Sequence, residues 1–136
     1  TSPGLPVVTV GFCFGGSQAW RQTTGDLPLA AAAGFYGRPS MVGGSPARRP
    51  VLMLIAGDDA ATPVADQLAL ADSLRAGGAE VETAVYDGAP HSFFDRASTE
   101  WADASADAWR RMWGFPDADQ GAAPARRDDD TPEEGR

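Results

Sequence analysis

The chain contains one residue that could serve as a catalytic nucleophile in a recognisable setting. Its single cysteine, Cys13, lies in the run GFCFGG (residues 11–16), directly after a β-branched stretch. A Gly-x-nucleophile-x-Gly run at a sharp strand-to-helix turn lifts a nucleophile above a parallel sheet, at a helix N-terminus that favours negative charge. Because this turn is tight, we expect side chains at both flanking positions, Gly11 and Gly15, to collide with the adjacent strand and helix. The alternative interpretation is a buried cysteine that acts as a small hydrophobic residue.

A thiol nucleophile needs a base and an acid, and the sequence offers both. His91, the single histidine, follows a strand-like stretch at the edge where parallel α/β sheets build their sites. Asp58 and Asp59 follow another strand-like run, and one of these carboxylates can accept the imidazole N–H and stabilise its charged form. Position alone favours neither Asp, and both could instead form a turn before a helix. The order cysteine, acid, histidine is that of α/β-hydrolases.

Strand and helix signals alternate along the first 116 residues. The predicted strands are residues 5–13, 29–36, 51–56 and 80–87. The first predicted helix covers residues 16–23. The second has Thr62 as its cap, begins at Pro63 and ends at Gly77, and the third extends from Ser98 or Thr99 to Gly114. In the last helix Trp101, Trp109, Met112 and Trp113 are expected to pack on the sheet, and residues 37–50 to form a connection that can border a pocket. The order β-α-β-β-α-β-α predicts an α/β fold with a mostly parallel sheet covered by helices.

Composition excludes several classes of function. A net charge of −8 argues against nucleic acid or an anionic membrane as partner. All eleven basic residues are arginine, which removes both a P-loop lysine and Schiff-base chemistry. One cysteine and one histidine provide neither a disulfide framework nor a structural zinc site, and no apolar run approaches the roughly 18 to 20 residues of a membrane span. We expect a cytoplasmic protein.

Three motifs in order resemble those of the dienelactone hydrolase family of α/β-hydrolases: GFCFGG (11–16), GDDAATP (57–63) and GAPHSFF (88–94). The resemblance implies an α/β-hydrolase-like parallel sheet flanked by helices and a catalytic triad of Cys13, Asp59 and His91. It selects Asp59 because the acid of the family's loop lies four residues before its proline. It further implies that the N–H of Phe14 is an oxyanion donor, and that no metal or organic cofactor takes part.

The resemblance runs from about residue 7 to residue 115 and covers the C-terminal half of a typical family member. The N-terminal strands of the sheet, with a second oxyanion donor, are therefore expected to be lacking. The first strand of this chain should then expose an edge, through which it pairs with a missing N-terminal half or another chain. An Arg that binds the substrate carboxylate in the family would fall at Asp95, with Arg96 next to it. Tyr36, Phe12 and Arg96 are the expected substrate contacts.

The expected organisation is a partial α/β-hydrolase domain over residues 1–116 and a disordered acidic tail over residues 117–136. This tail has seven acidic residues and no Leu, Ile, Val or aromatic residue. The expected function is hydrolysis of small carboxylic esters or lactones. The alternative is a non-catalytic fragment or a binding and assembly module with the same fold. A thiol redox protein is less favoured, because no second cysteine can resolve an oxidised Cys13.

Overall fold

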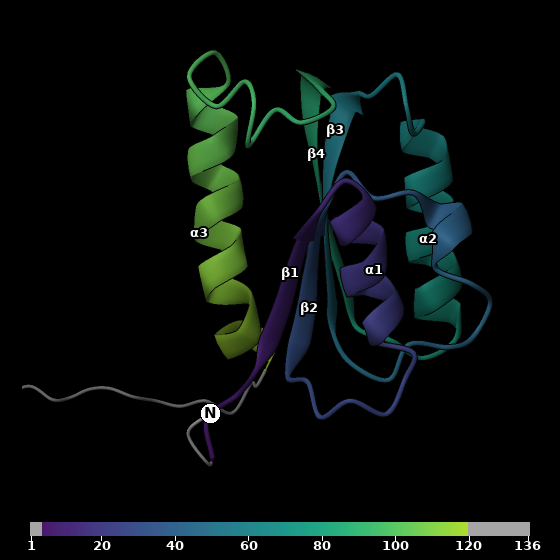
Figure 1. Cartoon of the computed structure of the whole chain (residues 1–136). Helices are drawn as coiled ribbons and strands as arrows, with labels where there is room; N and C mark the ends of the chain where they lie inside the picture. Colours follow the sequence, from purple (N-terminus) through teal and green to yellow (C-terminus); the bar gives the residue numbers. More distant parts are fainter. Residues whose placement is uncertain (1–3, 120–136) are drawn as a thin grey trace, which may run out of the picture.

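The computed structural model describes residues 4–119, in which a parallel sheet lies between helices (Figure 1). The four strands lie in the order β1-β2-β3-β4, and every neighbouring pair is parallel. The elements in chain order are β1 (Val8–Phe12), α1 (Phe14–Gln22), β2 (Ala31–Phe35), the 3-10 turn η1 (Pro39–Met41), β3 (Val51–Asp58), α2 (Val64–Ala76), β4 (Val81–Pro90) and α3 (Ala102–Asp119). The predicted α/β class and the predicted succession of strands and helices are confirmed.

The helices divide between the two faces of the sheet. In Figure 1, α1 and α2 lie on one side of the strands and α3 lies on the other. Because all strands run in the same direction, the loops that follow them meet at one edge of the sheet. Two backbone hydrogen bonds fix this edge: the N–H of Cys13 donates to the carbonyl of Phe35 (3.0 Å), and the N–H of Tyr36 donates to the carbonyl of Leu54 (2.8 Å).

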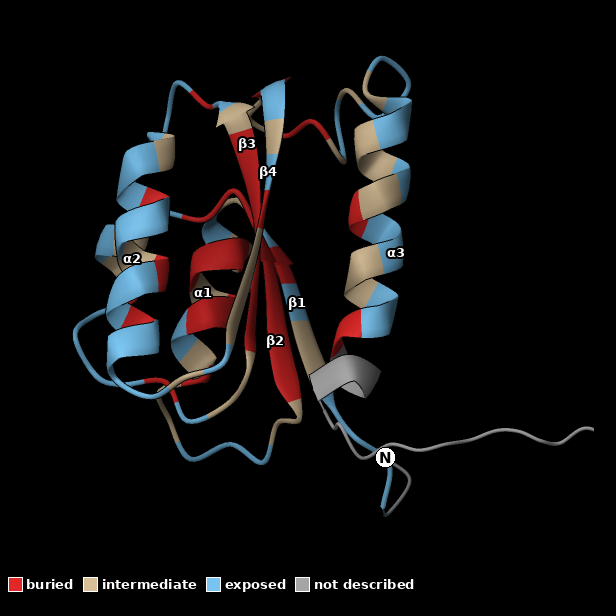
Figure 2. Ribbon diagram, turned by 180° about the vertical axis from the view of Figure 1, so that it is seen from behind, coloured by how far each residue is buried: buried red, intermediate tan, exposed pale blue. Residues whose placement is uncertain are grey.

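β3 forms the centre of the core. Its residues 51–56 are all 0% exposed, because helices cover the sheet on both faces. Side chains alternate between these faces: Leu52 and Leu54 belong to the cluster under α3, whereas Met53 and Ile55 belong to the cluster around Trp20 of α1. Figure 2 shows this burial as red along β2 and β3 and on the inward sides of the helices. A strand buried on both faces explains the continuous apolar run in the sequence.

The start of α2 differs from the prediction. Pro63 occupies the N-cap position without a side-chain capping bond, and the helix begins at Val64. Thr62, which was expected to cap it, instead donates its N–H to Oδ1 of Asp59 (3.0 Å) and accepts a bond from Nε2 of Gln67 at its carbonyl (3.2 Å). The prediction was wrong because the backbone of Thr62 is hydrogen-bonded to Asp59 within the loop, so that Pro63 takes the N-cap position.

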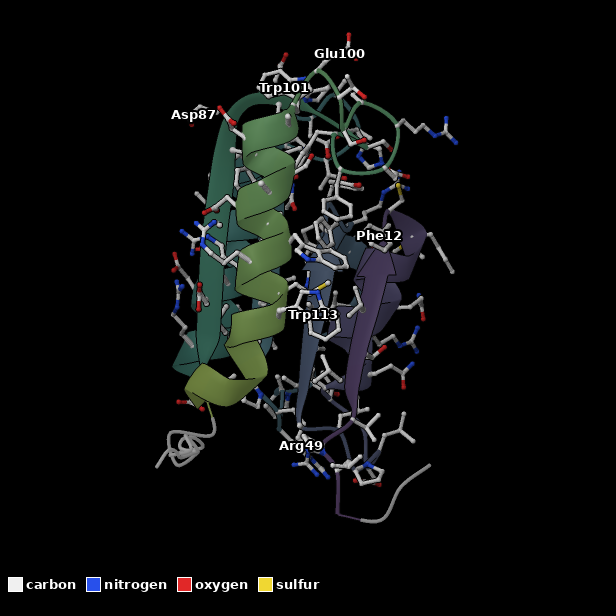
Figure 3. The ribbon with its side chains drawn as sticks, turned by 90° about the vertical axis from the view of Figure 1, so that its left-hand side faces the viewer. Phe12, Arg49, Asp87, Glu100, Trp101 and Trp113 are labelled. Atoms are coloured by element: carbon white, nitrogen blue, oxygen red, sulfur yellow. The ribbon has the colours of Figure 1, made fainter. Side chains whose placement is uncertain are left out.

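Two of the aromatic side chains expected to pack on the sheet do not do so. Trp101 and Met112 pack against the cluster under α3, as predicted. Trp109 and Trp113 are 50% and 63% exposed. The reason is the position of α3, which packs against β2, β3 and β4 and leaves the part of the sheet next to β1 uncovered. Figure 3 shows Trp113 on the side of α3 that faces β1, the strand that carries Phe12.

α3 begins and ends later than predicted. Residues 91–101 form turns, so that the helix begins at Ala102, and it continues through Gly114 to Asp119. Burial of Phe115, which is 3% exposed, opposes the roughly 1 kcal/mol that Gly costs within a helix. The first three residues of the predicted tail, 117–119, are therefore helical, and the rest of that prediction lies outside the described residues. Within residues 4–119, no helix is long and apolar enough to cross a bilayer.

Exposed and partly exposed apolar side chains gather around the part of the sheet that α3 leaves uncovered, and this group is called here the apolar face. It consists of side chains from β1, from the loop after β4 and from α3: Val10, Phe12, Phe94, Trp109 and Trp113. Successive ring centroids lie 5.6 Å apart from Phe12 to Phe94, 6.3 Å from Phe94 to Trp109 and 5.6 Å from Trp109 to Trp113. Within the described residues β1 pairs with β2 alone, so the edge of β1 beside this face offers unpaired backbone groups.

Candidate active site

Cys13 lies at the point where β1 turns directly into α1. It is the N-cap residue of α1 and has φ 56° and ψ −120°, a backbone conformation that L-residues rarely adopt. Such a conformation costs about 1 to 3 kcal/mol and persists only where the surrounding structure enforces it. Here the bond from the N–H of Cys13 to the carbonyl of Phe35 holds it at the carboxyl edge of the sheet. The strand-turn-helix context required by the sequence motif is present.

The glycines of the turn are required at Gly11 and Gly16, and not at both positions flanking Cys13. A Cβ atom at Gly11 would lie 1.9 Å from the carbonyl oxygen of Gly15, and one at Gly16 would lie 2.5 Å from that of Phe35. A Cβ at Gly15 meets nothing within 4 Å. The prediction for Gly15 was therefore wrong, because the close approach of α1 to β2 occurs one residue further along the helix.

A buried carboxylate orients His91. Nδ1 of His91 donates to Oδ2 of Asp59 at 2.8 Å, and the Asp59 side chain is 0% exposed. The other oxygen of Asp59 accepts the backbone N–H groups of Ala61 (2.8 Å) and Thr62 (3.0 Å), which fixes the carboxylate. Since an ionised carboxylate only accepts hydrogen bonds, the imidazole proton stays on Nδ1 and leaves the lone pair of Nε2 free. Asp58, the alternative that position left open, is exposed at the end of β3.

Cys13 and His91 face one pocket of about 180 Å³. Of the other residues predicted to contribute to the site, Phe14 and Tyr36 line this pocket, whereas Phe12 and Arg96 do not. As the first residue of α1, Phe14 has an N–H without an acceptor inside the helix, so this N–H is available to an oxyanion. Phe12 instead stacks on Phe35 with ring centroids 4.6 Å apart and contributes to the apolar face. Within residues 4–119, no three His, Cys, Asp or Glu side chains gather to hold a metal ion.

The sequence profile of the dienelactone hydrolase family matches residues 4–117. The chain belongs to the dienelactone hydrolase family. Two relatives provisionally named carboxymethylenebutenolidase, from Saccharolobus solfataricus and Salmonella typhi, are 34% identical over 113 residues and 32% identical over 120 residues. These matches cover 80% and 78% of this chain but 43% and 44% of the relatives. The chain thus spans less than half the length of these relatives.

Solved structures agree with this assignment. A dienelactone hydrolase-like promiscuous phosphotriesterase from metagenomic libraries, P91, is similar at a TM-score of 0.69 and 25% identity, over 82% of this chain and 52% of that chain. The acylaminoacyl peptidase of Pyrococcus horikoshii is similar at a TM-score of 0.67 and 16% identity, which shows the shared fold. This match covers 81% of this chain and 23% of the peptidase chain. The likeness therefore extends over most of this chain and part of each larger structure.

In this member of the dienelactone hydrolase family, Asp95 anchors Tyr36. The Tyr36 hydroxyl donates to Oδ1 of Asp95 at 2.8 Å, and the Tyr36 ring lies 5.0 Å from the His91 ring between centroids. Burial, followed by the hydrogen bond to Asp95, raises the pKa of Tyr36 well above its usual value of 10.0. The phenol therefore remains neutral and forms a fixed wall of the pocket. The position at which the family resemblance places an Arg is occupied here by a carboxylate with this structural role.

Two further residues, which were not predicted, reach the pocket or Cys13. The hydroxyl of Ser92 lies 3.5 Å from the sulfur of Cys13, and Ser92 is 8% exposed. Arg38 lines the pocket, and its N–H donates to the Ser17 hydroxyl (2.7 Å). The sequence held weak signals for both: Ser92 directly follows the histidine, and Arg38 is the second residue of the connection, 37–50, that was expected to be able to border a pocket.

Proposed function

We propose that this chain carries the site of a cysteine hydrolase that acts on small carboxylic esters or lactones. The observation that supports this most directly is the 2.8 Å bond from His91 to the buried Asp59, because His91 faces the same pocket as Cys13. In this proposal Cys13 is the nucleophile, His91 is the general base and Asp59 holds the imidazole in the required tautomer. Membership of the dienelactone hydrolase family supports the same reaction class.

The first half of the proposed reaction forms a thioester. Nε2 of His91 takes the proton of the Cys13 thiol, and the sulfur attacks the carbonyl carbon of the ester. The carbonyl oxygen becomes an oxyanion, which accepts a hydrogen bond from the N–H of Phe14. When the tetrahedral species collapses, the C–O bond to the leaving oxygen breaks and His91 returns its proton to that oxygen. The alcohol departs, or, from a lactone, the new hydroxyl stays on the acyl chain.

The second half releases the acid. His91, again neutral, takes a proton from a water molecule as the water oxygen attacks the thioester carbonyl. The new oxyanion again accepts from the N–H of Phe14, the C–S bond breaks, and the proton on His91 returns to the sulfur of Cys13. The sequence of steps consumes one water for each ester and uses only side chains, one backbone N–H and water.

The pocket supports a small substrate. Its volume of about 180 Å³ is below the roughly 300 to 1,000 Å³ of typical small-molecule sites, so we propose a short acyl group beside the ring of Tyr36. A free thiol nucleophile works in a reducing compartment, and we therefore propose a cytoplasmic location.

Hydrolysis of p-nitrophenyl acetate and of an enol lactone, followed by absorbance, tests the proposal. We expect turnover by the chain that falls to the uncatalysed rate in Cys13→Ala, with circular dichroism showing that both proteins are folded. The exposed residue Ser73 of α2 offers a matched control: Ser73→Ala should leave turnover unchanged. Turnover that survives in Cys13→Ala would contradict the proposal, and a folded chain without turnover would favour the second candidate function.

That second candidate is a binding module, and the apolar face supports it. Val10 and Phe12 are 40% and 37% exposed along the edge of β1. The opposite edge of the sheet is different: Glu82 of β4 pairs with Arg111 of α3 at 2.8 Å, and charged residues protect an edge from pairing. We propose that the apolar face receives the N-terminal half of a family member, which adds a strand to β1, since this chain spans less than half of its relatives.

Size-exclusion chromatography with light scattering tests this binding. The separately produced N-terminal half of the Saccharolobus solfataricus relative should form a one-to-one complex with the chain. Val10→Lys should abolish the complex, whereas Val85→Lys, at a similarly exposed valine of β4 (38%), should leave it intact. A complex that tolerates Val10→Lys would place the contact elsewhere, and self-association of the chain alone would assign the face to a second copy.

A further inference from the structure

Ser92 has no part in the proposed reaction, yet its side chain is directed at the nucleophile. Its hydroxyl oxygen lies 3.5 Å from the sulfur of Cys13, and the residue is 8% exposed. We propose that the Ser92 hydroxyl donates a hydrogen bond to the sulfur of Cys13 and stabilises its thiolate form. Ser92 is then a positioning residue for the nucleophile. Its catalytic meaning rests on the proposed function, whereas the contact itself can be tested without turnover.

The backbone at Ser92 indicates that its side chain has a use. Its φ is 66°, in the left-handed region that glycine adopts at no cost and serine does not. A turn enforces this conformation: the N–H groups of Arg96 (2.9 Å) and Ala97 (3.3 Å) both donate to the carbonyl of Ser92. Glycine would fit this turn better than serine. A residue with a strained backbone whose side chain touches a candidate nucleophile is the kind of outlier from which a functional hypothesis can be drawn.

The direction of the effect follows from the proton transfer. When Cys13 ionises, its S–H bond breaks, the proton moves to Nε2 of His91 and the electron pair stays on sulfur. The sulfur then accepts the O–H of Ser92 in a charge-assisted bond, which is stronger than the bond to a neutral thiol. A hydrogen bond to the charged form favours that form. Ser92 therefore raises the fraction of thiolate at a given pH.

Other charged and titratable groups also face the sulfur, and the test must separate them from Ser92. Tyr36, Arg38 and His91 line the same pocket as Cys13. The Tyr36 phenol is neutral because burial raises its pKa, and Arg38 remains charged. A variant that changes Ser92 alone leaves all of these groups in place.

The experiment measures how fast iodoacetamide alkylates Cys13 as a function of pH, in the parent chain, in Ser92→Gly and in Ser92→Ala. Both variants should move the midpoint of this profile upward by about one pH unit, a tenfold change in the ionisation equilibrium. Ser92→Gly also removes the backbone strain, so it should unfold at a higher temperature than Ser92→Ala. The matched control is Ser105→Ala, which removes a buried hydroxyl of α3 that has no hydrogen-bond partner within the described residues.

The outcomes separate this inference from the proposed function. An unchanged or lower midpoint in both folded variants overturns the role of Ser92, even if ester turnover depends on Cys13. The expected shift in a chain without ester turnover supports the contact and counts against the proposed function alone. Where turnover is present, Ser92→Gly should lose about tenfold in kcat/KM below the midpoint and recover at higher pH. A loss that is equal at every pH would mean a general structural effect and would contradict the inference.

Discussion

Replacing Asp59 by Asn changes the hydrogen-bond pattern of His91 while preserving the shape of the Asp59 side chain. In the parent chain, Oδ1 of Asp59 accepts the N–H groups of Ala61 at 2.8 Å and Thr62 at 3.0 Å. The carbonyl oxygen of the amide in Asp59→Asn can still accept both. The NH₂ group of the variant then faces Nδ1 of His91, at the position from which Oδ2 of Asp59 accepts a hydrogen bond at 2.8 Å in the parent chain. Since an NH₂ group only donates, Nδ1 must become the acceptor and the imidazole proton must move to Nε2. His91 can then no longer take the proton of Cys13.

The size of this effect can be estimated from the contacts. Forcing the wrong tautomer on the histidine of a triad costs about 10³- to 10⁴-fold in rate, or about 4 to 5 kcal/mol. Folding stability should change little, because the two backbone bonds survive. Asp59→Ala is different: it leaves the N–H of Thr62, a residue that is 3% exposed, without an acceptor. That should cost about 1 to 3 kcal/mol of stability in addition to the loss of rate.

The assay combines steady-state hydrolysis of p-nitrophenyl acetate with urea unfolding of the same proteins. Alkylation of Cys13 by iodoacetamide at neutral pH gives a second measure of proton transfer to His91. Asp58→Asn is the matched control, since Asp58 is the adjacent, exposed carboxylate at the end of β3, and it should retain full activity. If Asp59→Asn keeps more than a tenth of the parent rate, or if Asp58→Asn loses as much, the assignment of the acid is refuted.

Two further predictions concern stability. Gly16→Ala should destabilise the chain by about 1 to 3 kcal/mol in urea unfolding, since the added Cβ would lie 2.5 Å from the carbonyl oxygen of Phe35, whereas Gly15→Ala, with nothing within 4 Å, should not destabilise it. Equal losses of stability in Gly16→Ala and Gly15→Ala would contradict this prediction, because they would show that the turn tolerates a Cβ at neither position. Burial and the bond to Asp95 raise the pKa of Tyr36 in the folded chain above the 10.0 of the unfolded chain, so the unfolded state loses its proton first and stability should fall as pH rises above 10. Thermal unfolding between pH 8 and pH 11 measures this, and an equally steep fall in Tyr36→Phe would contradict it.

The parts of the fold that local patterns encode were predictable from the sequence. Residues 51–56 form a continuous apolar run, and the structure buries it completely between two layers of helix. The end of α3 was not predictable in this way. Gly114 is a local stop signal, but the helix continues because Phe115 packs into a core built from distant strands. A sequence pattern carries the local propensity and not the tertiary contact that overrides it.

The candidate site shows the same division. The order of Cys13, acid and His91 predicted residues that meet at one edge of a parallel sheet, and the elbow at Cys13 followed from its glycines. Whether Asp58 or Asp59 pairs with His91 depends on how β3 ends and its loop turns, which spacing alone does not specify. The direction of the Ser92 side chain depends on a left-handed turn held by residues further along the chain, so its place directly after His91 was the one weak signal for it.

The apolar face and the proposed triad are built from different side chains. His91 is fixed by Asp59, and Cys13 by the carbonyl of Phe35, so both depend on bonds within the carboxyl edge of the sheet. The apolar face adjoins this edge, because Phe12 directly precedes Cys13 and Phe94 lies in the loop that begins with His91, but none of its side chains lines the pocket. A partner that only covers these side chains should therefore leave the alkylation profile of Cys13 unchanged. It should raise ester turnover by about 10²- to 10³-fold if it adds a second oxyanion donor to the N–H of Phe14. If turnover and the alkylation rate rise together, the partner instead orders the side chains of the proposed triad.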